Sequence, residues 1–319
     1  MFQYPYSFLA PEGRNSRLSV LIFHRIQREV DPLFPGEPTA ASFDALLGNI
    51  KNWFNVIPLQ AAVVGLAEGH LPSRPLCISF DDGYADNCEV ALPVLKKHGL
   101  TASFFIATGY LDGGCMFNDK IVEAVRGCGA DALDLSPLSL GVYAMGTIEN
   151  KRQAIDALLG TVKYIPSPDR ERITGEICRL AGVSVPLDLM MSRGQVREMY
   201  KAGMGIGGHT RHHPILARAA ANKAMQEIAD GKSDVEEIIG APVNLFAYPN
   251  GKPGVDYLSE HVAMVREAGF LAAVSTAKGV AAYGADLFQL PRFTPWDQGA
   301  LKFGIRMGAN LRTRTYDKV

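Results

Sequence analysis

Short apolar runs alternate with longer amphipathic stretches along most of the chain. Apolar runs of this length indicate buried strands, and the amphipathic stretches between them indicate helices. Strands are expected at 18–23, 56–59, 76–80, 101–107, 203–208, 245–248, 271–275 and 287–293. Helices are expected at 43–53, 61–68, 87–98, 192–202, 221–239 and 257–268. Gly99, Gly240 and Gly269 directly follow three of these helices, where a helix C-terminus favours glycine.

This alternation predicts an α/β fold, a distorted (β/α) barrel of about seven to eight strands. The 319 residues contain no stretch that resembles a flexible linker, so we expect one domain over 1–319. The less regular segment 112–191 has helical patches and predicts a helical insertion. Because it follows the strand at 101–107 directly, we expect it at the end of the barrel that carries the active site, where it could select substrate. The alternative is a packing appendage without contact to substrate.

Composition excludes several classes of partner. The formal net charge of -1 argues against a broad electrostatic surface for nucleic acid or anionic lipid, and it favours a neutral or zwitterionic ligand. The five cysteines are scattered and form no close pairs, so we expect small buried side chains rather than a zinc knuckle. Residues 1–17 lack the pattern of a signal peptide, and the apolar run at 18–23 is too short for a transmembrane segment. We therefore expect a cytoplasmic location.

Two predicted strand ends carry residues typical of a mononuclear metal site. Asp81 and Asp82 directly follow the strand at 76–80, and His209 and His213 follow the strand at 203–208. The C-terminal ends of parallel barrel strands lie on one face, where active sites form. An isolated acidic pair most often begins a turn, and an isolated histidine pair most often lies on the surface. Their combination favours a catalytic site for one divalent cation.

The motifs resemble those of the NodB-type polysaccharide deacetylases, which are metal-dependent amidases that remove acetyl groups from N-acetylated sugars. Residues 80–83 (Phe-Asp-Asp-Gly) correspond to the first family motif, and residues 209–213 correspond to the second, His-[Ser/Thr]-x-x-His. Residues 246–251 resemble a divergent third motif. The resemblance extends from about Val20 to Arg292, with an unmatched stretch between about 112 and 192.

The resemblance implies a role for each matching residue. Asp82, His209 and His213 would bind the metal, which we expect to be zinc, with cobalt, nickel or iron as alternatives. Asp81 would be the general base. The main-chain N–H of Asn250 would stabilise the oxyanion, although an ordinary turn explains residues 248–251 equally simply. His212 could compete with His213 as a ligand, but the spacing and the resemblance favour His213.

The chain also departs from the family pattern. The third motif lacks the arginine of many relatives, residues 273–276 lack the aspartate that orients it, and no histidine follows His261. Leu290-Pro291-Arg292 stands where a late Leu-x-His motif would fall. These departures resemble an exopolysaccharide-associated branch of the family.

The departures leave the proton donor for the leaving amine open. His24 is our candidate because it follows the strand at 18–23, at the same end of the barrel as Asp81. It could equally be a histidine without catalytic duty, in which case Asp81 itself returns the proton. Arg292 remains charged, and His261 is expected on the exposed face of a helix.

The predicted function is hydrolytic N-deacetylation of an acetylated amino sugar in an oligosaccharide, a polysaccharide or a carrier-linked glycan. One alternative is a metal-dependent amidohydrolase that acts on a small cyclic amide or ureide, because fold does not fix substrate. Another is a non-catalytic glycan-binding relative. The intact Asp81 argues against the latter, since a binding module needs no base beside the metal. The sequence leaves the oligomeric state open.

Overall fold

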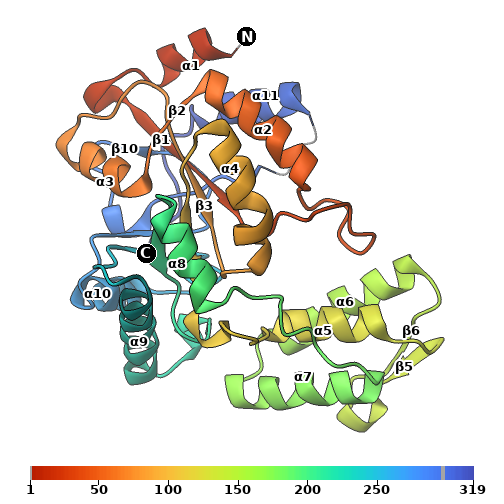
Figure 1. The fold of residues 1–319 in the computed structure, drawn as a ribbon. Helices are drawn as coiled ribbons and strands as arrows, with labels where there is room; N and C mark the ends of the chain where they lie inside the picture. The colour runs from red at the N-terminus through yellow and green to blue at the C-terminus, as the bar shows by residue number, and fades with distance from the viewer. Residues whose placement is uncertain (1, 296–298) are drawn as a thin grey trace. The chain divides into compact units, whose positions relative to one another are not determined.

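The computed structural model describes residues 2–295 and 299–319, and its chain divides into two compact units (Figure 1). The first unit comprises residues 1–29, 36–111 and 191–319, and the second comprises residues 30–35 and 112–190. The assignment of the whole chain to one deacetylase-like domain stays a prediction. None of the helices in the described part of the chain combines the length and the apolar character needed to cross a membrane.

The first unit is built on a parallel sheet with the strand order β1-β3-β4-β7-β8-β9. A two-residue strand pairs with β3, and an antiparallel strand pairs with β1. The bounds are β1 Arg17–Phe23, β2 Asn55–Val56, β3 Pro75–Phe80, β4 Ser103–Ile106, β7 Gly205–Gly208, β8 Leu245–Ala247, β9 Ala272–Val274 and β10 Ala281–Ala282. The parallel α/β architecture expected from the sequence is confirmed.

The last predicted strand differs from the observed structure. Residues Leu287–Gln289 form a 3₁₀ helix, so the prediction of a strand over 287–293 is wrong in its first half. Residues 290–293 nevertheless bond to both neighbours: the Leu290 N–H donates to the Ala273 carbonyl of β9, and the Phe293 N–H donates to the Val20 carbonyl of β1. This segment therefore joins the last parallel strand to the first, although Pro291 lacks the N–H that a regular strand needs.

Successive side chains along the strands alternate between two separate apolar clusters. Val20, Cys77, Phe105 and Val274 belong to one apolar cluster, whereas their chain neighbours belong to the larger cluster that packs against the surrounding helices. Strands buried on both faces read as continuous apolar runs, which explains why they were recognisable in the sequence. The helices of the first unit lie around the outside of its strands (Figure 1).

Six helices of the first unit overlap the predicted ones, whereas α1 and α11 were not predicted. Their bounds are α1 Gln3–Leu9, α2 Ala40–Trp53, α3 Leu59–Glu68, α4 Leu92–His98, α8 Arg193–Lys201, α9 Ala221–Ile239, α10 Ser259–Glu267 and α11 Ala300–Asn310. A π-helical turn at Asn87–Ala91 precedes α4. Gly99 and Gly240 adopt the left-handed conformation at the ends of α4 and α9, as predicted. His261 is only 1% exposed, so its placement on an exposed helix face is wrong; its Nδ1 accepts the Leu258 N–H at the start of α10.

The second unit has its own apolar core. It contains α5 Phe117–Gly127, a hairpin of β5 Ala132–Asp134 and β6 Val142–Ala144, α6 Ile148–Val162 and α7 Ser167–Ala181. Residues such as Ile121, Leu133, Leu158 and Ile177 are fully or almost fully buried among one another. A core of this kind gives the segment a stability of its own. Its role in substrate selection stays a prediction.

The close packing of β7 against its neighbours depends on Gly207. A methyl group there would lie 2.5 Å from the Phe105 ring and 2.9 Å from the Leu245 carbonyl. We expect Gly207→Ala to lower the free energy of unfolding by about 1–3 kcal/mol, the usual effect of overpacking. In Gly48→Ala, the new methyl lies within α2 and 3.8 Å from the His98 ring, so this control should gain about 1 kcal/mol. Denaturant unfolding of both variants measures the difference, and equal stabilities would contradict the proposed close packing.

Candidate metal centre

Three strands position the candidate site, which lies entirely in the first unit. Asp81 and Asp82 directly follow β3, and His209 directly follows β7, while β4 lies between these two strands in the sheet. The strands run parallel, so their C-terminal ends meet at one edge. The fold thus brings together the two motifs that lie more than a hundred residues apart in the sequence.

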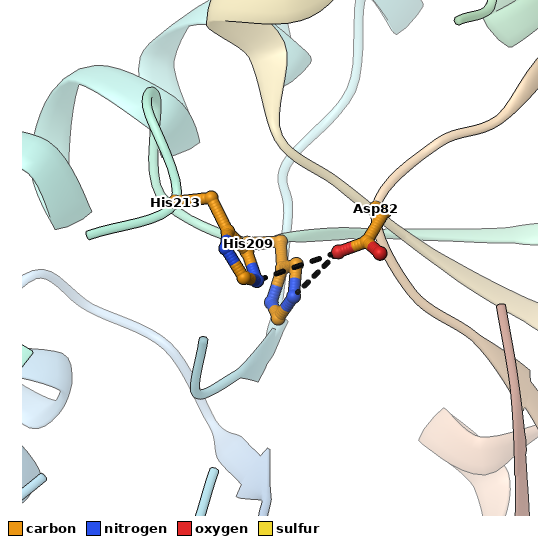
Figure 2. A group of neighbouring side chains, drawn as sticks. All are labelled: Asp82, His209 and His213. Carbon is orange, nitrogen blue, oxygen red and sulfur yellow. Dashed lines mark ion pairs between the residues drawn. The ribbon is translucent and has the colours of Figure 1, made fainter. Parts of the chain in front are cut away.

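The backbone at Asp82 separates the two neighbouring carboxylates. Strand alternation directs Asp81 to the same side as Ser79, and the Arg292 guanidinium contacts both residues. Asp82 instead has φ of 76°, in the left-handed region that an aspartate adopts more readily than most residues. Figure 2 shows the result: the Asp82 carboxylate faces the imidazoles of His209 and His213.

Asp82, His209 and His213 form a cluster of ligand atoms that fits a metal ion. Oδ1 of Asp82 lies 3.4 Å from Nε2 of each histidine, and the three ligand atoms lie within 4.8 Å of one another (Figure 2). This buried oxygen has no hydrogen-bond partner among the described residues. A buried carboxylate oxygen without a donor is unfavourable, and a cation among the three atoms would satisfy it. One carboxylate and two imidazoles leave coordination positions open, as catalytic zinc sites require.

Neighbouring groups orient both histidines. Nδ1 of His209 lies 2.7 Å from the Ala247 carbonyl, to which it donates, so Nε2 is free to bind a cation. The His213 N–H donates to the Thr210 hydroxyl at 3.0 Å, and this hydroxyl donates to the His209 carbonyl. Thr210 therefore supports the loop between the two histidines.

His212 does not compete with His213 in this structure. Its Nδ1 lies 3.0 Å from the Glu227 carboxylate, which also accepts the His212 N–H at 2.7 Å. The His212 side chain is about half exposed, whereas the His213 side chain is 16% exposed and lies beside Asp82. This geometry agrees with the choice of His213 as the ligand candidate.

Burial and charge set opposite pKa shifts within the cluster. Burial raises the pKa of Asp82, but the His209 imidazole and the other histidines lower it more, so this pKa lies well below its usual range. Burial lowers the pKa of His213 to about 4. Burial also lowers the pKa of His209, but Asp82 and Asp81 outweigh this effect and raise it. Without a cation the raised pKa of His209 therefore favours its protonated form, and a metal ion would compete with that proton.

Asp81 forms a bidentate ion pair with Arg292. The two guanidinium nitrogens lie 2.7 Å from the two carboxylate oxygens, and both side chains are buried. Arg292 also donates from Nε to the Ser275 carbonyl at 2.8 Å and contacts the Ser79 hydroxyl at 3.3 Å. Burial raises the pKa of Asp81, but the charges of Arg292 and His209 lower it below its usual value. Asp81 is therefore ionised at neutral pH.

Arg292 is the site residue that sequence reasoning did not recognise. The sequence indicates only that Arg292 is a poor proton donor, yet its guanidinium holds the candidate base from the segment that joins β9 to β1. The available signal in the sequence is the position of Arg292. Leu290 and Arg292 are two residues apart in an extended segment, so their side chains lie on the same side, toward the barrel interior. An arginine on the inner side of a closed sheet needs an acidic partner, and Asp81 follows β3 on that side.

The structure offers fewer contacts that bear on the predicted roles of Asn250 and His24 than on the ligand cluster. Asn250 has φ of 57°, and its carbonyl accepts the Thr276 hydroxyl at 2.9 Å. Its N–H meets no hydrogen-bond acceptor among the described residues, so it is available to an oxyanion. His24 is exposed and follows β1; its charge contributes a minor part to the lowered pKa of Asp81. The roles of both residues stay predictions.

Strained backbone conformations gather around this site. Seven residues other than glycine have positive φ in the described chain, and four of them belong to the motifs discussed above: Asp82, Thr210, His213 and Asn250. Each such conformation costs on the order of 1–3 kcal/mol and persists only where the surrounding contacts fix it. Such strain is typical of functional sites rather than of ordinary turns.

The first unit thus combines a parallel α/β barrel with a cluster of potential metal ligands at its strand ends. The sequence profile of the polysaccharide deacetylase family matches residues 68–133 and 145–273, and the chain belongs to this family. It is 20% identical to YxkH of Bacillus subtilis (strain 168), a predicted polysaccharide deacetylase, over 278 residues that cover 87% of this chain and 71% of YxkH.

Solved structures share the fold at low sequence identity. IcaB from Ammonifex degensii superposes with a TM-score of 0.60 at 18% identity and covers 95% of this chain and 99% of its own. The Streptococcus pyogenes deacetylase PplD superposes with a TM-score of 0.59 at 18% identity, over 87% of this chain and 92% of its own. The sequence profile confirms the predicted family, and these structures confirm the deformed barrel.

Metal analysis tests the ligand cluster directly. We expect the wild type to bind one zinc ion per chain at saturating zinc, and His213→Ala to lose this ion because it removes one of the three ligands. His70→Gln is the control, since this exposed side chain lies outside the ligand cluster. His212→Gln tests the rival ligand, whose side chain bonds to Glu227. Inductively coupled plasma analysis after removal of excess zinc measures the content. Loss of zinc from His212→Gln with full content in His213→Ala would reverse the assignment.

Proposed function

We propose that the protein hydrolyses the N-acetyl group of an acetylated amino sugar within an oligosaccharide, a polysaccharide or a carrier-linked glycan, with one divalent cation, most simply zinc. The observation that carries the proposal is the pairing of an ionised, buried Asp81 with the adjacent ligand cluster of Asp82, His209 and His213. The family and the relatives with deacetylase names support the reaction class. The cytoplasmic location stays a prediction.

Each residue has a distinct role in this proposal. A divalent cation bound by Asp82, His209 and His213 would polarise the amide carbonyl and lower the pKa of water to about 7. Asp81 accepts the proton of the attacking water. Both of its oxygens bond to Arg292, but each carboxylate oxygen has a second lone pair available. Arg292 holds the carboxylate in one orientation and in its ionised form.

The two remaining steps concern the oxyanion and the leaving amine. The Asn250 N–H donates to the oxyanion that forms as water attacks the carbonyl. His24, which is exposed and directly follows β1, then protonates the amine before it departs. If His24 has no such duty, Asp81 returns the proton it has accepted. The C–N bond breaks, and acetate and a free amino sugar are the products.

Replacement of the base tests the reaction. We expect Asp81→Asn to retain zinc but to lose about 10²–10⁴-fold in kcat, because an amide cannot accept the water proton. Release of acetate from N-acetylglucosamine oligomers measures turnover, with metal content determined in parallel. Asp44→Asn, a replacement of an acidic residue that pairs with Lys97 and His98, controls for the loss of a negative charge. Near-native turnover of metal-loaded Asp81→Asn would refute the assigned role.

The pH dependence tests Arg292. Arg292 lowers the pKa of Asp81, so its removal leaves burial dominant and raises that pKa. Because Asp81 acts as a base only when ionised, we expect Arg292→Met to move the acidic limb of kcat/KM to higher pH. Breaking a buried ion pair also costs about 3–5 kcal/mol of stability, so thermal unfolding must establish that the variant is folded.

Arg292→Lys provides the matched comparison. Lysine retains the positive charge but not the two parallel hydrogen bonds, so the acidic limb should return part of the way toward the wild-type position. An acidic limb that is identical in wild type, Arg292→Met and Arg292→Lys would show that the group titrating there is not Asp81.

A further inference from the structure

One face of α9 carries acidic residues where a helix packed on a barrel usually carries apolar ones. Glu227, Asp230, Gly231 and Asp234 are spaced i, i+3, i+4 and i+7, which places them along one stripe of the helix. Residues such as Ile228 and Val235 form the apolar contact with the core instead. We call Glu227, Asp230 and Asp234 the acidic stripe and residues 209–214 the histidine loop.

The acidic stripe bonds to the middle of the histidine loop. The Arg211 guanidinium donates to both carboxylate oxygens of Asp234, with Nε at 2.8 Å, and to Asp230 at 3.1 Å. The Arg211 N–H donates to the Glu227 carbonyl at 3.2 Å, and the Glu227 carboxylate accepts the His212 N–H at 2.7 Å. Bidentate contacts of this kind fix orientation as well as distance.

Gly231 permits this close approach. A methyl group at this position would lie 2.6 Å from the Thr210 carbonyl carbon and 3.0 Å from the Arg211 nitrogen. These neighbours are backbone atoms, which cannot rotate away as a flexible side chain can. The helix and the loop are therefore in direct backbone contact beside the first ligand candidate.

The end of β4 holds the same loop from another side. The Thr108 hydroxyl donates to Asp234 at 2.7 Å, so one carboxylate bonds both to this strand end and to Arg211. The Gly109 N–H donates to the Arg211 carbonyl at 2.8 Å, and the Tyr110 hydroxyl donates to the His212 carbonyl at 2.9 Å. Arg211 and His212 are thus fixed through both main chain and side chain.

Arg211 and His212 lie between two residues with strained backbone conformations. Thr210 has φ of 63° and His213 has φ of 49°. This region is strongly unfavourable for a β-branched threonine and uncommon for any residue other than glycine, although histidine adopts it more often than most. Released from its contacts, the loop would relax, and the imidazoles of His209 and His213 would no longer converge on Asp82. The metal would then have to supply the energy of ordering the loop, and its affinity would fall.

We propose that the acidic stripe and Arg211 are positioning residues that hold the histidine loop in its metal-binding conformation before the metal binds. This inference rests on the metal centre of the proposed function. It assigns a purpose to three acidic residues and an arginine outside the ligand set. Outer contacts of this kind commonly change metal affinity about 10–100-fold.

Zinc affinity and stability together test the proposal. We expect Arg211→Met and Asp234→Ala each to weaken zinc binding about 10–100-fold in a competition titration with a chromophoric chelator. The visible spectrum of the Co²⁺-loaded protein should change as well, since it reports ligand geometry. Arg211→Lys should recover part of the affinity, because it keeps the charge without the bidentate geometry. Asp234→Asn preserves the side-chain shape and replaces Asp234→Ala if that variant does not fold.

Lys232→Met is the matched control on the same helix. Lys232 anchors α9 by donating to the Ala268 and Gly269 carbonyls at 2.8 and 2.9 Å, away from the histidine loop. Lys232→Met should lower the Tm of the metal-free protein but leave its zinc affinity unchanged. If Arg211→Met and Asp234→Ala lower only the Tm, as Lys232→Met does, the stripe is a structural anchor and the proposal is overturned.

The outcomes separate this proposal from the proposed function. Weakened zinc binding in the loop variants, together with a wild type that binds zinc but releases no acetate from any glycan, would support the positioning role and refute the deacetylase reaction. A wild type that releases acetate, with loop variants of unchanged zinc affinity, would refute the positioning role alone. A wild type that binds no divalent cation would overturn both.

Discussion

The ion pair of Asp81 and Arg292 is the interaction on which the site depends. Both groups are buried, and two unpaired charges in such an environment would each be unfavourable by several kcal/mol. The pair also joins distant parts of the chain, since Asp81 follows β3 and Arg292 lies in the segment that connects β9 with β1. The segment that closes the sheet therefore also supplies the positive charge that favours the ionised form of the candidate base.

This dependence explains how two adjacent carboxylates acquire different tasks. Asp81 bonds to a guanidinium through both oxygens, whereas Oδ1 of Asp82 is buried, faces two imidazoles and meets no hydrogen-bond donor in the part of the chain that the structure describes. Similar groups in different surroundings commonly divide catalytic roles in this way. The left-handed backbone at Asp82 produces the separation, because it redirects one carboxylate at the strand end while the other follows the strand's alternation.

The sequence predicted those parts of the structure that depend on local pattern. Helix ends followed from glycines such as Gly99 and Gly240, and the ligand cluster followed from motifs at two strand ends. The rest depends on tertiary contacts that no local pattern contains. The first half of the predicted strand at 287–293 became a 3₁₀ helix, and His261 is buried because its ring caps its own helix rather than facing solvent.

The role of Arg292 also depends on tertiary contacts that a local sequence pattern does not contain. Its residue type and position were visible in the sequence, but its role required knowledge of which strands lie next to one another in the closed sheet. Many relatives carry an arginine in the third motif. In this chain Arg292, in the segment between β9 and β1, supplies a positive charge beside Asp81. A barrel permits this substitution because the C-terminal ends of all its parallel strands open onto one face, so several strands can supply a group to the same point in space. The absence of a motif residue from its usual place in the sequence is therefore weak evidence that its chemical role is absent, and the inner face of the closed sheet is the place to look for the replacement.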